Sequence, residues 1–251
     1  MSDEIAISLD RVTKDYKRGS AATMGLKAAL LHPVDYLRQC RGKQRFRALD
    51  DITLTIRKGE CLGIVGRNGS GKSTMLGLIA GVLAPNSGTV TTHGRISPLL
   101  ELGAGFHHEL TGRENILLNG VLLGMTRREV LSRMDKMIEF SELAGFINEP
   151  IRTYSSGMLA RLGFSVAVHL EPQILLVDEV LAVGDEPFQA KCFHKIRDFH
   201  AQGVTTVVVS HSQKMIEDIC DRAALVNASR LVAVGTPGEV FGQYRAILDG
   251  P

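Results

Sequence analysis

Cysteine is scarce in this sequence, and none of it is arranged in pairs. The chain has 251 residues, and its cysteines show no CxxC pair and no metal-ligand spacing; they are Cys40, Cys61, Cys192 and Cys220. No apolar run approaches the roughly 18 residues that a membrane-spanning helix needs. The N-terminus, MSDEIAISLD, is acidic and does not resemble a signal peptide. We therefore expect reduced thiols and a soluble protein that reaches a membrane only through a partner.

Net charge is small as well, at +2 for the whole chain, which argues against a nucleic-acid partner. The charge is unevenly distributed, however. Residues 17–47 carry eight Lys and Arg against one Asp, a local charge of +7, so the rest of the chain carries −5. This segment, about residues 18–47, is predicted to be a basic helical insert. Pro33 suits the first turn of a short helix that ends before Gly42.

Hydrophobic patterns predict an α/β core. Alternating patterns at residues 5–12 and 51–56 indicate half-buried strands, and continuous apolar runs at 60–66, 173–179 and 205–211 indicate buried parallel strands. A helix is predicted at 73–83, a helical block with two capping boxes from about 111 to 146, and a hairpin at 223–235. This alternation predicts an α/β fold with an inserted helical subdomain.

The strongest motif is GRNGSGKST, which matches GxxxxGK[ST] between a predicted strand and a predicted helix. It comprises Gly66, Arg67, Asn68, Gly69, Ser70, Gly71, Lys72, Ser73 and Thr74. Glycines let backbone N–H groups approach phosphate oxygens, and the helix adds the positive end of its dipole. Lys72 is predicted to reach the β- and γ-phosphates of a nucleotide, and Ser73 to ligate Mg²⁺. An ordinary glycine turn is the alternative, but the complete motif in this context disfavours it.

A second motif ends the predicted strand ILLVDE with two carboxylates. Asp178 is predicted to hold Mg²⁺, through water, because hard cations prefer oxygen ligands. Glu179 is placed to polarise the water that attacks the γ-phosphate in line. An acidic pair at a strand end could also be a solvated turn, but its occurrence with a phosphate loop favours the catalytic interpretation.

Four further segments resemble the motifs of ABC ATPases. YSSGM, at residues 154–158, is similar to the LSGGQ signature, and DEVLAVGD is similar to the D-loop that ends at Asp185. His211 matches the switch histidine, and Tyr16 is similar to the aromatic residue that stacks on adenine. The motifs stand in the family's order. The resemblance implies an ABC-type P-loop NTPase core with an N-terminal antiparallel β subdomain.

The resemblance also implies how the sites work. ATP would be held between two protomers of a homodimer, bound to Lys72 of one and to the signature of the other, with Mg²⁺ as cofactor. The signature residues are Ser155, Ser156, Gly157 and Met158, of which Ser156 and Met158 depart from the usual Gly and Gln. Ser155 can equally be a plain helix N-cap, and His211 alone would more often be a buried histidine. The glutamine of the Q-loop is absent, and Glu101 takes its place as an expected Mg²⁺ ligand.

The segments that contain these departures, LLELGAGFHHELTGREN and YSSGM, together with VLAVGD, resemble those of the ATPase subunits of bacterial polysaccharide exporters. Those exporters move lipid-linked O-antigen, capsular polysaccharide or teichoic acid. The resemblance covers about residues 4–247. It implies a single ABC ATPase domain over 1–251, a helical subdomain at about 111–170, and no C-terminal carbohydrate-binding domain. The expected partner is an integral membrane permease, and the expected location is the cytoplasmic face of the inner membrane, as a peripheral protein. Rival readings are another ABC transporter class, for lipids or small molecules, and a soluble non-transport ABC ATPase.

The insert remains to be explained. An apolar face joined to a cationic end suits a surface beside anionic headgroups. We expect it to face the permease near the entry of the lipid-linked substrate, with Tyr36, Arg38 and Arg41 most exposed. A helical embellishment packed on its own domain is the alternative, because amphipathicity alone names no partner.

Overall fold

The computed structural model describes residues 4–17, 45–99, 105–178, 185–210 and 212–248. The strands are β1 (Ile5–Lys17), β2 (Arg45–Arg57), β3 (Cys61–Val65), β4 (Ser87–Thr92), β5 (Ile96–Leu99), β6 (Ile174–Val177), β7 (Thr205–Val209), β8 (Arg222–Asn227) and β9 (Arg230–Gly235). The helices are α3 (Lys72–Ile79), α4 (Gly112–Leu122), α5 (Arg127–Ser141), the 3₁₀ turn η2 (Ile151–Thr153), α6 (Ser156–Ala167), α7 (Glu186–Ala201), α8 (Gln213–Ile219) and α9 (Pro237–Leu248).

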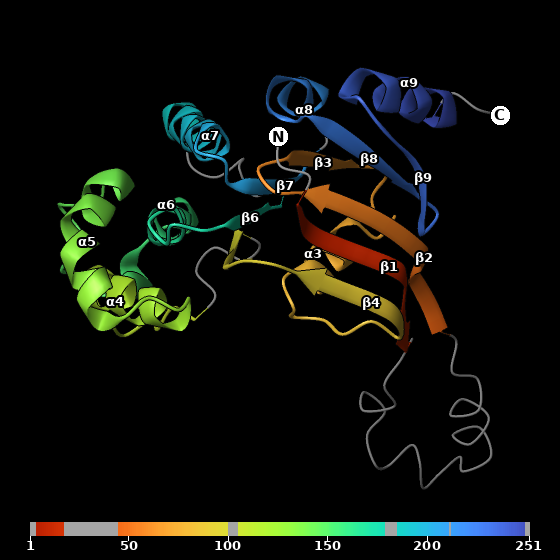
Figure 1. Ribbon diagram of the computed structural model, residues 1–251. Helices are drawn as coiled ribbons and strands as arrows, with labels where there is room; N and C mark the ends of the chain where they lie inside the picture. The colour runs from red at the N-terminus through yellow and green to blue at the C-terminus, as the bar shows by residue number, and fades with distance from the viewer. Residues whose placement is uncertain (1–3, 18–44, 100–104, 179–184, 211, 249–251) are drawn as a thin grey trace, which may run out of the picture.

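Two sheets form the core of the fold (Figure 1). The larger has six strands in the order β5-β6-β7-β3-β8-β9, with β5 to β8 parallel and β9 antiparallel to β8. The smaller has three antiparallel strands in the order β2-β1-β4. The prediction of an α/β fold with an antiparallel sheet near the N-terminus is confirmed, as is the hairpin formed by β8 and β9.

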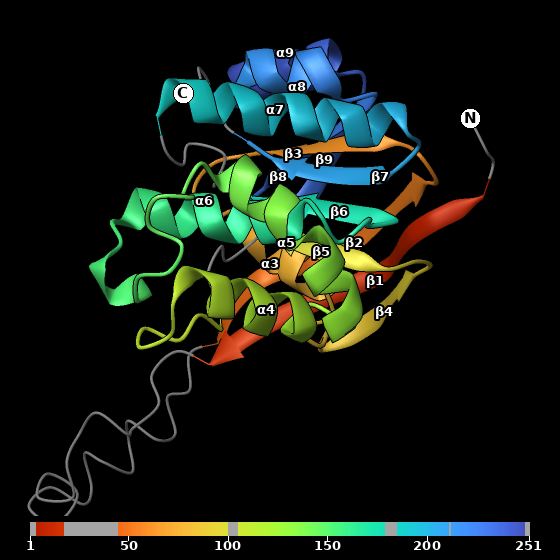
Figure 2. The same ribbon diagram turned by 90° about the vertical axis from the view of Figure 1, so that its left-hand side faces the viewer.

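Successive side chains of β3 point to opposite faces of the six-stranded sheet, and each face is covered by its own hydrophobic cluster. Leu62 and Ile64 point toward α3 and the three-stranded sheet, where they join one buried cluster. Cys61 and Val65 point the other way, into a second cluster made with the later helices. This period of two is what a strand covered on both faces requires. Figure 2 shows α7, α8 and α9 over one face of the six-stranded sheet, with β1 and β4 beyond the other.

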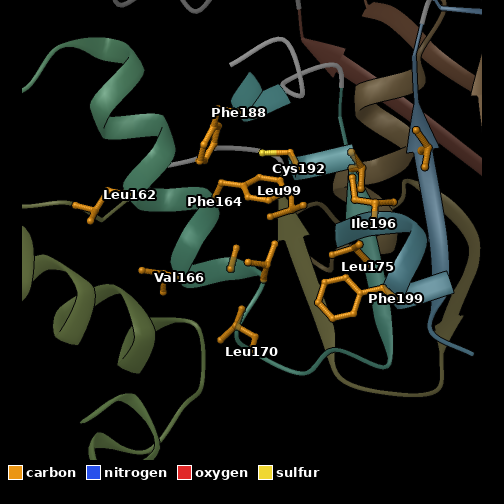
Figure 3. Close-up of a cluster of buried hydrophobic side chains, with 14 of the residues drawn as sticks. Leu99, Leu162, Phe164, Val166, Leu170, Leu175, Phe188, Cys192, Ile196 and Phe199 are labelled. Atoms are coloured by element: carbon orange, nitrogen blue, oxygen red, sulfur yellow. The ribbon is translucent and has the colours of Figure 1, made fainter. Parts of the chain in front are cut away.

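The second cluster joins the helical segment to the sheet. Phe164 and Leu162 of α6 and Phe188 of α7 are fully or almost fully buried. Figure 3 shows Phe164 and Phe188 on the side of α6 that faces Leu99 of β5 and Leu175 of β6, with Leu162 on the opposite side. Helices α4, α5 and α6 lie together at one side of the sheet (Figure 1). The signature segment is therefore carried by a helix that packs directly on the central sheet.

Both predicted capping boxes are present. Thr111 Oγ1 accepts a hydrogen bond from Glu114 N at 3.2 Å, and the Glu114 carboxylate accepts one from Thr111 N at 2.9 Å. Thr126 and Glu129 repeat the arrangement at the start of α5. Each reciprocal pair satisfies two backbone N–H groups that would otherwise lack partners. These local signals therefore set where α4 and α5 begin.

The basic insert, predicted for about residues 18–47, was extended too far toward the C-terminus, because β2 already begins at Arg45. Arg45 and Arg47, expected within it, form the start of β2, where Arg45 pairs with Lys17 and Arg47 with Asp15. Nε of Arg47 donates to Asp15 at 3.0 Å, and Nη1 donates to Asp50 at 2.8 Å. The cross-strand contact with Asp15 of β1 favours the strand, and Asp50 adds a local contact within β2. The helix predicted at 73–83 is shorter in the structure, where α3 spans Lys72–Ile79. Within the described parts of the chain, no helix is sufficiently long and apolar to cross a membrane.

Candidate nucleotide-binding site

The phosphate loop, residues 66–74, connects β3 to α3 and is fixed by close backbone packing. Gly66 has φ 151°, and a Cβ there would lie 2.0 Å from the carbonyl oxygen of Val226 in β8. Gly71 has φ 110°, and its Cβ would lie 2.4 Å from the carbonyl oxygen of Ala48 in β2. Only glycine fits at both positions. The loop is thus held between strands of both sheets.

Lys72 lies at the start of α3 with its ammonium group turned into the loop. Its Nζ donates to the carbonyl oxygens of Gly66 at 2.8 Å and Arg67 at 3.2 Å, and the residue is buried. Burial lowers the pKa of Lys72, and the charge of Asp178 partly opposes that shift. Strands β3 and β6 both run parallel to β7, so their carboxyl ends, which lead to the phosphate loop and to Asp178, lie at the same edge of the sheet. The structure therefore brings together the lysine and the first acid of the two predicted motifs.

The residues around this loop fit a nucleotide with its magnesium ion. Gly71 caps α3 without a side chain, so the N–H groups of the helix's first turn need another acceptor. Among the described side chains, the Ser70 hydroxyl is buried with no hydrogen-bond partner. Ser73 is exposed in the first turn of α3. A phosphate oxygen suits the N–H groups, and the Ser73 hydroxyl and Asp178 carboxylate are oxygen ligands of the kind that Mg²⁺ prefers.

The signature segment, residues 155–158, forms the N-terminus of α6. Ser155 is the N-cap, and its Oγ accepts a hydrogen bond from Met158 N at 3.2 Å. The cap role that the sequence allowed is therefore present. The segment lines a hollow of about 470 Å³ that also includes the predicted D-loop residue; its walls are Leu143, Ser155, Ser156, Gly157, Met158, Arg161 and Asp185.

Arg161 joins the signature helix to α7. Its guanidinium group donates to Glu142 at 2.8 Å and to Asp185 at 2.6 Å, and it lies 4.8 Å from the ring centroid of Phe188. Asp185 also caps α7 by accepting from Phe188 N at 3.3 Å. Lys191 completes the group by donating to Glu142 at 2.9 Å. Hydrogen bonds from Lys191, together with the positive charges of Lys191 and Arg161, lower the pKa of Glu142.

Sequence reasoning did not single out Arg161. It stands within the apolar run that forms α6, where a charged residue needs a partner to be buried. A single arginine within an apolar run was therefore the feature of the sequence that could have indicated a buried ion pair. Its partners are 19 and 24 residues away in the chain, so the pairing itself follows only from the fold.

The remaining predicted residues divide into two groups. Tyr16, near the end of β1, is partly exposed, and Lys14 Nζ lies 5.5 Å from its ring centroid. Six others lie outside the described residues; they are Glu101, Glu179, His211, Tyr36, Arg38 and Arg41.

Comparison with known sequences decides the family. The family model described as ABC transporter matches residues 49–182, which include the phosphate loop, the signature and Asp178. The chain belongs to the ABC transporter family. The prediction of an ABC ATPase made from the motif order is confirmed.

Relatives of this ABC protein extend the match beyond the family model. The chain is 51% identical to the O-antigen export system ATP-binding protein RfbB of Klebsiella pneumoniae, over 96% of this chain and 98% of that protein. It is 52% identical to a protein of the same name in Myxococcus xanthus, covering 96% of this chain and 55% of the relative. Identity to the teichoic acids export ATP-binding protein TagH of Lactiplantibacillus plantarum is 39%, over 98% and 66% of the two chains.

Solved structures agree on the fold of this ABC protein. A dimeric post-hydrolysis state of the ATP-binding cassette MJ0796, bound to ADP and Pi, has a TM-score of 0.73 at 22% identity, covering 92% of this chain and 98% of that one. An ATP binding subunit of an ABC transporter has a TM-score of 0.74 at 20% identity, covering 98% and 95%. At these identities the likeness establishes the ABC cassette fold and nothing finer.

Proposed function

We propose that this chain is the ATP-hydrolysing subunit of an exporter that moves a lipid-linked, O-antigen-like polysaccharide across the bacterial cytoplasmic membrane. It acts as a homodimer, peripherally on the cytoplasmic face, bound to an integral membrane permease. The observation that carries the proposal is the 51% identity to an O-antigen export ATP-binding protein along 98% of that relative's length. Identity spread over nearly two whole chains supports the same partner surfaces as well as the same ATPase core.

The described residues can perform the binding half of this chemistry. Loop N–H groups and the ammonium of Lys72 bind the phosphates of ATP, and the α3 dipole adds to the attraction. Ser73 and Asp178 would hold Mg²⁺, with Glu101 as the proposed third ligand in the Q-loop position. When bound, the ion supplies positive charge at the β- and γ-phosphate oxygens. Glu179 takes a proton from the attacking water, and His211 contacts the γ-phosphate.

The role of Glu179 is tested by Glu179→Gln, because an amide cannot accept the proton from water. ATP binding should persist while turnover falls on the order of 10² or more. Equilibrium binding and single-turnover hydrolysis measure the two effects separately. Lys72→Ala serves as the control that loses binding itself. Hydrolysis by Glu179→Gln near the wild-type rate would remove Glu179 from this role.

The dimer proposal makes each active site composite, with Lys72 from one protomer and Ser155 from its partner. A mixed dimer of Lys72→Ala and Ser155→Arg chains collects both lesions in one site and leaves the other intact. We expect such mixtures to recover part of the activity that each parent lacks. Heterodimers should first be verified by differential tags. Mixtures with verified heterodimers but no recovery would show that each site is built within one chain.

The basic insert supplies the proposed contact with the permease, through Tyr36, Arg38 and Arg41. Each cation beside an anionic membrane surface contributes about 1 kcal/mol, so several together have a measurable effect. A triple Ala variant at Arg38, Arg41 and Lys43 should retain ATP hydrolysis by the isolated subunit and reduce polysaccharide export in cells. Normal export at normal expression would favour the alternative, an insert packed on its own domain.

The competing functions differ in cargo and partner. TagH relatives are named for teichoic acids, so a teichoic acid cargo is the nearest alternative. A lipid or small-molecule transporter is more distant, and a non-transport ABC ATPase more distant still. Deleting the gene separates them: loss of surface polysaccharide with retention of its lipid-linked precursor in the cytoplasmic leaflet supports export. A surface polysaccharide that is unchanged would count against it.

A further inference from the structure

A second aromatic side chain faces Tyr16 across the β1–β2 pair. In the antiparallel register Tyr16 lies directly opposite Phe46, and the two residues are 37% and 44% exposed. Residues directly opposite in an antiparallel pair place their side chains on the same face of the sheet. Figure 1 shows the end of β1 and the beginning of β2 side by side. The sequence pattern placed Phe46 in the basic insert and predicted no function for it.

That shared face is the one that meets the phosphate loop. Leu49 is the register partner of Lys14, and its Cδ2 lies 2.6 Å from where a Cβ on Gly71 would be. Lys14 Nζ reaches the carbonyl oxygen of Ala84, just beyond α3, at 2.6 Å. Since side chains two apart on a strand share a face, Tyr16 points to the same side as Lys14. Tyr16 and Leu49 are thus both turned toward α3 and its loop.

A bulge brings Phe46 to this side as well. Lys14 pairs with Leu49 but Asp15 pairs with Arg47, so β2 contains one extra residue, Ala48. In a regular strand Leu49 and Phe46 would point to opposite faces, and the extra residue reverses this. Arg47, on the other face, forms its ion pair with Asp15, as this alternation requires. Ala48, the bulged residue, is also the one whose carbonyl oxygen approaches Gly71.

We propose that Phe46 is a second contact for the purine ring of the bound nucleotide, beside Tyr16. Phe46 is two residues, roughly 7 Å along a strand, from the point where β2 touches the loop. A nucleotide anchored by its phosphates extends its ribose and base over that distance. Aromatic faces bind bases by stacking, which is largely indifferent to base identity. The two rings would therefore favour a nucleoside triphosphate over inorganic triphosphate. This inference rests on the nucleotide site proposed above.

Binding of ATP and of inorganic tripolyphosphate to the full chain tests the proposal. Phe46→Ala should raise the Kd for ATP about fivefold or more, the lower end of what stacking contributes. The Kd for tripolyphosphate should not change, because it has no base. Phe46→Tyr keeps the ring and should restore ATP binding, whereas Phe46→Leu should restore it only in part. Phe146→Ala removes another exposed aromatic side chain (54%), from the helical segment, and should leave both affinities unchanged.

Two controls separate this inference from the proposed function. Lys72→Ala should weaken both ligands, and Tyr16→Ala should weaken ATP alone; if neither does, the nucleotide site itself is wrong. If both behave as expected while Phe46→Ala binds ATP like wild type, only the Phe46 contact is wrong. Equal weakening of ATP and tripolyphosphate by Phe46→Ala would also overturn it, since Phe46 would then act by holding the strand or the loop. In that case the side chain packs against its own chain, and a lowered melting temperature would accompany the loss.

Discussion

The phosphate loop and the signature end of α6 are built in opposite ways. The loop is fixed by backbone packing: Gly66 and Gly71 lie against the carbonyl groups of Val226 and Ala48, with no space for a Cβ. The signature end is held by side chains, namely the Ser155 cap and the ion pairs of Arg161 with Glu142 and Asp185. The two acids are about half exposed. Backbone packing is insensitive to ionic strength, whereas partly exposed ion pairs are screened by salt.

This difference suits the proposed roles. A loop that wraps the phosphates of its own protomer needs one fixed shape, because each N–H group has to meet an oxygen. A segment that meets the partner's nucleotide has to approach and withdraw between cycles of hydrolysis. Partly exposed ion pairs permit such movement, because their carboxylates can exchange the cation for water. Adding a methyl group at a loop glycine should therefore disrupt the loop. Removing the charge of Arg161 should disrupt the signature end.

The largest contrast is expected between two glycine substitutions. Gly66→Ala forces a Cβ to within 2.0 Å of a backbone oxygen, so it should destabilise the fold by about 3 kcal/mol and weaken ATP binding at least about tenfold. Gly157→Ala meets only Ser155 Oγ, at 3.8 Å, and should leave the melting temperature unchanged or slightly raised. Its defect should appear only in hydrolysis by the dimer. Thermal melting, ATP titration and turnover measure the three effects. Equal destabilisation by both variants would show that the loop and the signature end do not differ in how they are held.

Arg161 provides the next largest effect. Its side chain is only 17% exposed, so Arg161→Ala leaves two carboxylates without their shared cation and should cost about 1–2 kcal/mol. Arg152→Ala is the matched control, because that pair with Glu109 is exposed at both ends (59% and 64%) and should cost about 0.5 kcal/mol or less. Denaturant unfolding of both variants at low and high salt gives the comparison. If Arg152→Ala costs as much, or the Arg161 effect does not shrink in high salt, the network is not what holds α6 to α7.

Local signals in the sequence were sufficient for much of this molecule. The phosphate loop, both capping boxes and the β8–β9 hairpin depend on residues that are neighbours in the chain, and each lies where the pattern indicated. The α/β core followed from apolar runs that only a sheet covered on both faces can bury. Such features are encoded within about ten residues and need no tertiary information.

Long-range pairing explains what the sequence did not show. Arg45 and Arg47 looked like the end of a basic insert, but pairing with β1 places both in β2, where Arg47 binds Asp15, 32 residues away. The bulge at Ala48 depends on register with β1, so the orientation of Phe46 could not be read from its neighbours. Arg161 gains its significance from Glu142 and Asp185, which the fold brings together. Composition reported the charge of these residues correctly, but not their partners.

The smallest effect is expected at the two capping boxes. There a charged side chain is bound by backbone N–H groups, so the boxes combine the two kinds of interaction compared above. Hydrogen bonds from the backbone N–H groups of Thr111 and Thr126 lower the pKa of Glu114 and Glu129 below the ordinary 4.5. A carboxyl whose pKa is lower in the folded state stabilises that state above its unfolded pKa, and the contribution is lost as pH falls through the folded pKa. Glutamine can fill the same box without titrating. A Glu114→Gln, Glu129→Gln double variant should therefore melt about one degree lower than wild type at pH 7, and the difference should shrink as pH falls below 4.5. Melting curves from pH 7 to 3 test this, with Glu217→Gln as a control carboxyl that caps no helix. A difference that stays constant across the range would mean that the boxes act through shape alone, without the charge.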